Sequence, residues 1–304
     1  PMGPTSVPFG ITGLQPSDGQ SASGGLMALA PGGRTGPDGK FRICDLSPGT
    51  YRFMAWEMGA GQGLQQALGN HALVPLSIGD QDLANVKINL APGPELTGEV
   101  VLEGPAPVTP IDAKVPVMLS PLLRSNLPGE NFNVRSGIPD TFSFRGLVMS
   151  DYTVHASINA PGFYIKDVTY SGNSVLYQPL HMAGAIEGAG LRIAVANDGA
   201  TLKAAVTDKD GNPGADMQVL VLPQEISSEA MLQSMLVTGL TDQFGNYHSH
   251  ALAPGKYYVV ATNEAFDATP ESIGRLWRAR AHFQEVDLTP NGSAQLTLQP
   301  LKIE

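Results

Sequence analysis

The stretch DGKFRICDLSPGTYRFMA, residues 38–55, decides how the rest of the chain is interpreted. Phe41 and Ile43 alternate with polar neighbours, and Tyr51 and Phe53 do the same after a Ser-Pro-Gly turn. Alternation with a period of two indicates half-buried strands. Pro and Gly supply the backbone angles that a tight turn needs. The stretch therefore predicts a β-hairpin.

The hairpin pattern returns twice along the chain. Its aromatic and aliphatic positions recur at one constant offset as Phe142, Leu147, Tyr152 and Ala156, and at a second as Tyr247, Leu252, Tyr257 and Ala261. A repeat of domain length predicts three tandem modules. We place them at residues 1–94, 95–197 and 198–304, and name them the first, second and third modules. The short linkers 91–93 and 197–199 predict modules in a fixed relation, arranged as a rod.

Composition and hydrophobic patterning favour an all-β chain. The 304 residues are 42% hydrophobic and 15% charged, with 35 Gly and 25 Pro, while a typical domain has about 25% charged residues. The prediction is three tandem seven-stranded-type antiparallel β-sandwiches, Ig-like or transthyretin-like. One short helix is expected in the last module at 270–281, where Ile273, Leu276 and Trp277 form an apolar stripe after Pro270.

The charge balance and hydropathy exclude two classes of partner. The net charge is −10 and no Lys/Arg cluster appears, which argues against nucleic acid. No apolar run reaches the ~20 residues of a membrane span, so the chain is not expected to cross a membrane. Cys44 is the single cysteine, so no disulfide forms within the chain; we expect it at the surface, where an intermolecular disulfide is the alternative.

The first module lacks a counterpart of one strand. Leu96 and Leu202 open strands that precede Phe142 and Tyr247 by similar distances, and the same offset from Phe41 falls before residue 1. The Gly/Ser-rich start substitutes for this strand, or a preceding segment was cut off, or another chain supplies it. In the last case, head-to-tail donation predicts a fibre. The candidate donors are Thr5–Leu14 and Gln295–Ile303 of a neighbouring copy.

The hairpin carries a resemblance to a known family. The pattern G-x-F-x-[FI]-x-x-L-x-P-G-x-Y-x-[VF]-x-A, at Gly39–Ala55 and Gly245–Ala261, resembles the carboxypeptidase regulatory-like domain, one of the transthyretin-like, carbohydrate-binding-like β-sandwiches. Tyr164–Gly172 and Glu271–Arg278 are similar to multi-module exported proteins of acidobacteria. The resemblance implies a non-catalytic structural or accessory module of an exported, extracellular or cell-surface protein. It implies no cofactor and brings no zinc ligands.

Two clusters have weak metal-binding patterns. Asp208, Asp210 and Asp216 lie in DKDGNPGAD, which resembles the start of a calcium loop but lacks its central Gly spacing and closing Glu. A β-turn explains the same residues. His248 and His250 share one face of a predicted strand, and a third ligand is missing. A solvated strand face is the alternative.

Aromatic residues supply the remaining candidate site. Trp56, Tyr164 and Tyr170, with Tyr177 and Trp277, are candidates for a sugar-stacking platform, and the alternative is a core or module-junction role. No Ser-His-Asp elbow, HExxH or phosphate-binding loop appears. We therefore expect a non-enzymatic extracellular structural protein that self-associates into a filament or adjoins modules of a longer chain. The alternative is a carbohydrate-binding or adhesive accessory protein.

Overall fold

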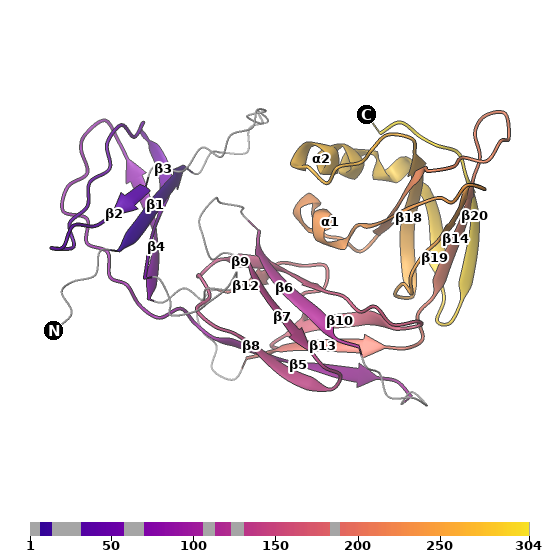
Figure 1. The fold of residues 1–304 in the computed structure, drawn as a ribbon, viewed down its shortest axis with the longest axis horizontal. Coiled ribbons are helices and arrows are strands. Elements are labelled where there is room, and N and C mark those ends of the chain that lie inside the picture. The colour runs from indigo at the N-terminus through magenta and orange to yellow at the C-terminus, as the bar shows by residue number, and fades with distance from the viewer. Residues whose placement is uncertain are drawn as a thin grey trace.

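The computed structural model describes residues 7–13, 32–57, 70–105, 113–122, 131–182 and 189–303. These residues form mostly β-strands, arranged in five sheets, and the expected all-β class of tandem sandwiches is confirmed. Each sheet takes its strands from only one of the ranges named above as modules (Figure 1).

One four-stranded antiparallel sheet occurs in all three modules with the same strand order. The first contains β2 (Gly32–Arg34), β1 (Pro8–Gly13), β3 (Gly49–Trp56) and β4 (His71–Ile78), in that order. The second contains β7 (Phe132–Ser136), β6 (Val115–Pro121), β9 (Asp151–Ala156) and β12 (Leu180–His181). The third contains β16 (Val237–Leu240), β15 (Gln218–Pro223), β18 (Gly255–Thr262) and β19 (Gln284–Leu288). The second strand of each predicted hairpin therefore lies in this sheet.

A second sheet completes the sandwich in the second and third modules. In the second module its order is β11 (Asn173–Ser174), β10 (Tyr164–Tyr170), β13 (Leu191–Ala196), β5 (Leu96–Glu103) and β8 (Asp140–Phe144). In the third its order is β17 (Asn246–His248), β14 (Thr201–Val206) and β20 (Ser293–Leu298). The opening strands β5 and β14 are central, antiparallel to the first hairpin strand and parallel to the closing strand. The sequence predicted antiparallel sandwiches, whereas this second sheet contains one parallel pair of strands in each of the two modules.

The repeated tyrosine closes each hairpin corner. The Tyr152 hydroxyl donates a 2.6 Å hydrogen bond to the Val148 carbonyl, and the Tyr257 hydroxyl donates one of 2.7 Å to Ala253, four residues upstream in both cases. The Tyr51 hydroxyl makes the same bond to the Ser47 carbonyl at 2.7 Å. A buried ring with its hydroxyl satisfied by the turn fixes how the two hairpin strands, one from each sheet, meet.

Two α-helices cover one face of the third module, where the sequence predicted one. The expected helix is α2 (Pro270–Ala279), and it begins at Thr269, whose side chain accepts a hydrogen bond from the Ser272 amide. The additional helix is α1 (Glu229–Met235), which buries Met231 and Leu232. The two helices share a core with strand residues such as Leu220 and Val260. None of the helices in the described part of the chain is long and apolar enough to span a membrane.

The first and second modules meet at a close-packed junction. The His71 imidazole lies 3.1 Å from the Leu147 carbonyl through Nε2 and is 7% exposed, so this nitrogen acts as the donor. Met54 and Val148 form a small buried cluster beside it. A Cβ on Gly93 would come within 2.4 Å of His71 Cε1 and 2.5 Å of the Leu147 oxygen, so only glycine fits there.

The second and third modules meet through a polar linker and through helix α1. The Gly199 amide donates to the Gly162 carbonyl at 3.2 Å, and the Tyr164 hydroxyl donates to Asp198 at 3.0 Å. Helix α1 contacts β9, where the hydroxyls of Ser234 and Thr153 are 3.3 Å apart. The modules are thus held in contact, and the first and third lie on the same side of the second in Figure 1, so the path through the three modules is bent.

Candidate functional site

The described part of the first module has one sheet, where the second and third modules each have two. One face of the sheet β2-β1-β3-β4 carries the core residues Phe9, Ile11, Phe53 and Ala55, each at most 5% exposed, and partly buried residues of the segments opposite pack against them. The segments that face them, residues 40–47 and 79–90, contain no strand. Phe41 and the residues after it belong to the predicted first hairpin strand, so the hairpin prediction is wrong for this half of the pattern in the first module.

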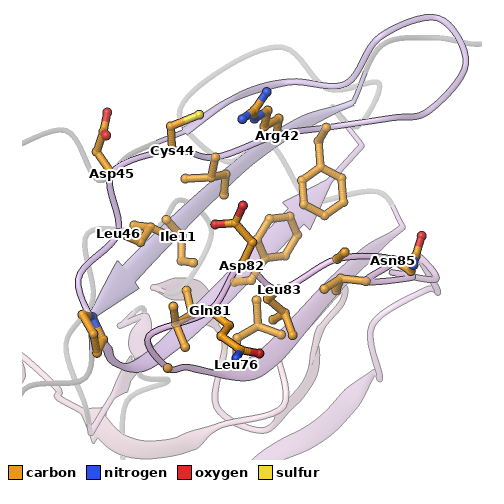
Figure 2. A pocket seen from close by; sticks show the side chains of 18 of the residues that line it. Ile11, Arg42, Cys44, Asp45, Leu46, Leu76, Gln81, Asp82, Leu83 and Asn85 are labelled. Carbon is orange, nitrogen blue, oxygen red and sulfur yellow. The ribbon is translucent and has the colours of Figure 1, made fainter.

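An open groove runs between these two segments. The larger part has a volume of about 1000 Å³, and a second part of about 410 Å³ shares Gly39, Phe41, Phe53 and Val86 with it. Figure 2 shows Ile11 between the two walls, with Arg42, Cys44 and Asp45 along one wall and Gln81, Leu83 and Asn85 along the other. The groove floor is formed by β1, β3 and β4, through residues such as Ile11, Phe53 and Leu76.

The hairpin positions provide an internal comparison of burial. Phe142 and Tyr247 are 7% and 4% exposed, whereas Phe41 at the same repeat position is only half-buried. Leu147 and Leu252 are 0% and 6% exposed, whereas Leu46 is again half-buried. The same residue types are therefore present in the first module without the cover they receive in the other two.

The backbone of both groove walls is also sparsely hydrogen-bonded to the rest of the described chain. Among the hydrogen bonds between described backbone groups, none uses an N–H or C=O of residues 41–46 or 82–90. Backbone groups in a folded protein are normally paired with another polar group or with water. Two wall segments without backbone–backbone hydrogen bonds to other described residues, with Ile11 and Phe53 between them, lie where a sandwich strand is missing from the described part of this module.

The second and third modules show what lies at this place in a complete sandwich. In the second, β5 lies between β8 and β13. In the third, β14 lies between β17 and β20. Gly98 of β5 is opposite Phe142, and Ala204 of β14 is opposite Tyr247. The counterpart of these central strands is absent from the described part of the first module.

The groove rim carries charges of both signs. Lys40 Nζ is 3.0 Å from Asp38 Oδ2, and hydrogen bonds from Lys40 hold the pKa of the Asp38 carboxyl below its ordinary value. Arg42, Asp45, Asp80 and Asp82 also line the larger part. The Cys44 thiol is exposed on the same wall, as expected for a surface cysteine. With apolar floor and mixed rim, the groove suits an extended peptide better than a small ion.

The candidate metal ligands are not brought together. The Asp208 carboxylate accepts hydrogen bonds from the Asn212 side chain at 3.0 Å and from the Asn212 and Asp210 backbone amides at 2.8 and 2.9 Å, which lower its pKa and close a turn. Asp216 has a left-handed backbone with φ of 56°. His248 ends β17 and His250 lies beyond it, both exposed. Within the described residues, no group of three His, Cys, Asp or Glu side chains could hold a metal.

The candidate aromatic platform is likewise dispersed. Trp56 packs against the Met54–Val148 cluster at the first junction. Tyr164 is 6% exposed and donates to Asp198 at the second junction. Tyr170 packs against the core of the second module, while Tyr177 and Trp277 pack against the helix-covered core of the third. Burial raises the pKa of Tyr177 to about 12.

Both candidate donor segments are used within their own modules. Of Thr5–Leu14, residues 8–13 form β1, and Phe9 and Ile11 are buried in the first core; residues 5, 6 and 14 lie outside the described part. Of Gln295–Ile303, residues 295–298 belong to β20, and Ile303 is 5% exposed among the residues that pack with α2. In this single chain, the described residues of both segments would have to leave their own modules in order to act as donors.

Sequence reasoning found the missing strand but not the groove that its absence leaves. The sequence of the groove walls predicts strands because apolar residues alternate with polar ones, but alternation does not show whether another strand is present to pair with them. The informative signal was that the hairpin pattern occurs three times, whereas an opening strand precedes it only twice. The sequence analysis also missed the hydrogen bonds from the repeated tyrosine hydroxyls to the turn carbonyls. A Tyr at the same distance after the turn in all three copies could have predicted them.

Comparisons with known proteins show a similar architecture at low similarity. No protein-family model matches the chain, and no curated protein matches it. Solved structures that resemble it include the Bacillus anthracis TIE protein (12% identity, 98% of this chain and 47% of that one, TM-score 0.23). A second is the minor pilin of Streptococcus agalactiae (13% identity, 69% of this chain and 97% of that one, TM-score 0.27). A third is the major pilin subunit of Bacillus cereus (10% identity, 98% of this chain and 95% of that one, TM-score 0.21).

The chain spans about half the length of the TIE protein. We base no functional argument on similarities at this level. The resemblance to the carboxypeptidase regulatory-like domain rests, as before, on the hairpin pattern alone.

Proposed function

We propose that this chain is a non-enzymatic structural protein of the cell surface, and a repeating subunit of an extracellular filament assembled by strand exchange. The observation that carries the proposal is the groove of the first module, which lies between two segments, residues 41–46 and 82–90, that make no backbone–backbone hydrogen bond with other described residues. Strand addition from another chain would provide partners for such segments. Head-to-tail addition that does not close into a ring gives a filament.

The packing between modules supports a load-bearing role. At the first junction, the buried His71 side chain and the tight fit of Gly93 leave little room for hinge motion. At the second, helix α1 rests on β9 across the module boundary. A subunit whose modules are fixed in this way transmits strand pairing at one end into a regular repeat. The proposal assigns no catalytic residue and no cofactor.

Electron microscopy of native material from the producing cells tests the function. Labelling with an antibody against the third module is expected to decorate surface fibres at a regular spacing, because every subunit carries one copy of the epitope. Label that is confined to a monodisperse soluble protein would contradict the filament. An antibody against an unrelated surface protein serves as the control for nonspecific decoration.

A further inference from the structure

We propose that strand β20 of the third module is the contact of a two-fold dimer, in which it pairs antiparallel with β20 of a second copy. Gln295 lies at the two-fold axis, and each β20 keeps its place beside β14 in its own sheet. The contact joins the two third modules through one continuous sheet. It lies outside the groove of the first module, goes beyond the proposed filament function and does not depend on it.

The second module shows which strand is missing beside β20. Its closing strand β13 pairs with β5 on one side and with β10 on the other. In the third module, the closing strand β20 pairs with β14 alone among the described strands. The chain between β9 and β12 forms β10 and β11, whereas the chain between β18 and β19 forms helix α2 and the short turn of helix after it. One edge of β20 is therefore left without the strand that β10 provides to β13.

The backbone of this edge is open at three residues. The Thr207 amide donates to the Leu298 carbonyl at 3.0 Å, so the even-numbered residues of β20 direct their backbone groups toward β14. Because this direction alternates along a strand, the backbone groups of Ser293, Gln295 and Thr297 point away from β14. All three residues are exposed, and their amides and carbonyls have no hydrogen-bond partner among the described residues. Three amides and three carbonyls are thus available to another strand.

Strand β20 also lacks the features that protect the other edge strands. Exposed edges are normally blunted by short length, by charged residues or by Pro. Every other edge strand of the described sheets has at most four residues, contains Pro, or contains a charged residue. The short ones are β2, β11, β12, β16 and β17, while β4 contains Pro75, β7 Arg135, β8 Asp140 and β19 Glu285. β20 has six residues, SAQLTL, with neither Pro nor charge.

The same comparison identifies the occupant as β20 of a second copy. A partner has to bring an open edge of its own, because a strand that is paired on both sides would first have to leave its sheet. β20 of a second copy meets this condition without any change in the fold, since it stays paired with β14. The other described edges carry the protective features above. β10 lies antiparallel on β13, and two strands related by a two-fold axis across their edges are antiparallel as well.

The spacing of the open residues fits an axis at Gln295. Ser293 of each copy then lies opposite Thr297 of the other, and the two Gln295 residues lie opposite each other. Each of these pairs exchanges two backbone hydrogen bonds, so every open amide and carbonyl of the edge is used. The side chains add a hydroxyl pair at both ends and an amide pair at the centre, where each amide both donates and accepts.

The core side of the strand supports the same register. Ala294 is half-buried and Leu296 is 9% exposed, and both belong to the core of the third module. With the axis at Gln295, Ala294 of one copy lies opposite Leu296 of the other, so a small side chain meets a large one and the edge of each core gains cover. β20 lies at the right of Figure 1, on the side of the third module that faces away from the first module.

A charge exchange at the axis tests the dimer and its register. Sedimentation of the 304-residue protein over a range of concentrations is expected to show a reversible dimer. Gln295→Lys and Gln295→Glu are each expected to weaken it by about tenfold or more, because each places like charges opposite each other. A mixture of the two variants is expected to restore a dimer with one copy of each. Gln243→Lys and Gln243→Glu are the controls, because Gln243 is also exposed but lies in the turn before β17.

An engineered disulfide tests the pairing directly. Opposite Cα atoms in a hydrogen-bonded antiparallel pair are about 5.5 Å apart, a distance that a disulfide spans. Cys44→Ser removes the only native thiol. In this background, Gln295→Cys is expected to give a disulfide-linked dimer under mild oxidation, whereas Gln243→Cys is expected to stay monomeric.

Hydrogen exchange reports on the same edge in the unmodified protein. In dilute solution the amides of Ser293, Gln295 and Thr297 are expected to exchange fast, while those of Ala294 and Leu296 are protected by β14. At concentrations that give the dimer, the first three are expected to become protected as well. An unmodified protein that stays monomeric even at millimolar concentration would overturn the proposal, and so would dimers that tolerate either charge at residue 295. A mixture of the Lys and Glu variants that fails to pair would overturn the axis at Gln295.

Discussion

The tyrosine repeated in each hairpin is the residue on which the sandwich corners depend. Tyr152 is 0% exposed and its hydroxyl bond to Val148 is buried, whereas the equivalent bond of Tyr51 is exposed. An unsatisfied buried carbonyl costs about 1–3 kcal/mol, whereas an exposed one pairs with water. The two residues therefore form a matched pair in one chain.

We expect Tyr152→Phe to lower the free energy of unfolding of the second module by about 1–3 kcal/mol. Tyr51→Phe is expected to change the stability of the first module far less. Urea unfolding monitored by hydrogen exchange resolves the two modules. If Tyr51→Phe lowered the free energy of unfolding of the first module as much as Tyr152→Phe lowers that of the second, the proposed difference between the exposed and the buried hydrogen bond would be refuted.

Gly93 is the second residue on which a local contact depends, because only a residue without a side chain lets the linker pass between His71 and the hairpin turn at Leu147. Gly93→Ala is expected to displace the His71 ring and loosen the first junction. Faster proteolysis within residues 91–95 is the measurement. Gly79→Ala is the control, because a Cβ there meets nothing within 4 Å; equal proteolysis of both variants would contradict the role of Gly93.

At the scale of elements, helix α1 on β9 forms the part of the second junction that responds to pH. His155 of β9 is half-buried, and burial lowers the pKa of its imidazole, against a weaker opposing hydrogen bond that the imidazole donates to the Ser234 backbone. The exposed imidazole has a pKa of about 6.5. The His155 imidazole therefore binds a proton more weakly when α1 is packed on β9 (the packed state) than when this contact is open (the open state).

The sign of the pH effect follows from linkage. Below about pH 6.5 the open state binds more protons than the packed state, so acidification favours opening until the lowered pKa of the packed form is passed. We expect hydrogen exchange in β9 and α1 to be faster at pH 5 than at pH 7.5, after correction for intrinsic rates. His155→Gln is expected to remove this difference, and an unchanged difference in that variant would contradict the assignment.

An element could be predicted from the sequence when the residues that stabilise it lie close to one another in the chain. The hairpins were found because alternation, Pro and Gly all act within a few residues, as in Gly245–Ala261. Helix α2 was found from its Thr269-Pro270 start and apolar stripe. Helix α1 has only seven residues, and its stability comes from burying Met231 and Leu232 against strands far away in the sequence.

The groove illustrates the same limit. Phe41 and Ile43 carry a strand pattern, but a strand exists only when another strand pairs with it, and that pairing is a property of the whole sheet. The aromatic candidates illustrate a related limit. Sequence placed Trp56, Tyr164 and Tyr170 in one class by residue type, and the fold distributes them over two junctions and a core.

At the scale of the whole molecule, the three modules follow a bent path (Figure 1). The contacts at Gly93 and at α1 predict that this bend persists in solution. Small-angle scattering of the dissociated 304-residue chain is expected to fit one bent arrangement. A broad distribution of sizes would show that the junctions act as flexible linkers, contrary to this expectation.

The central claim is that the first module is completed by a strand from another subunit. An electron cryo-microscopy reconstruction of native fibres tests it most directly. The account predicts density for one extended segment in the groove between residues 40–47 and 79–90, with a chain trace that leads into the neighbouring subunit. An empty groove in the assembled fibre, or a segment traced to the same subunit, would contradict it.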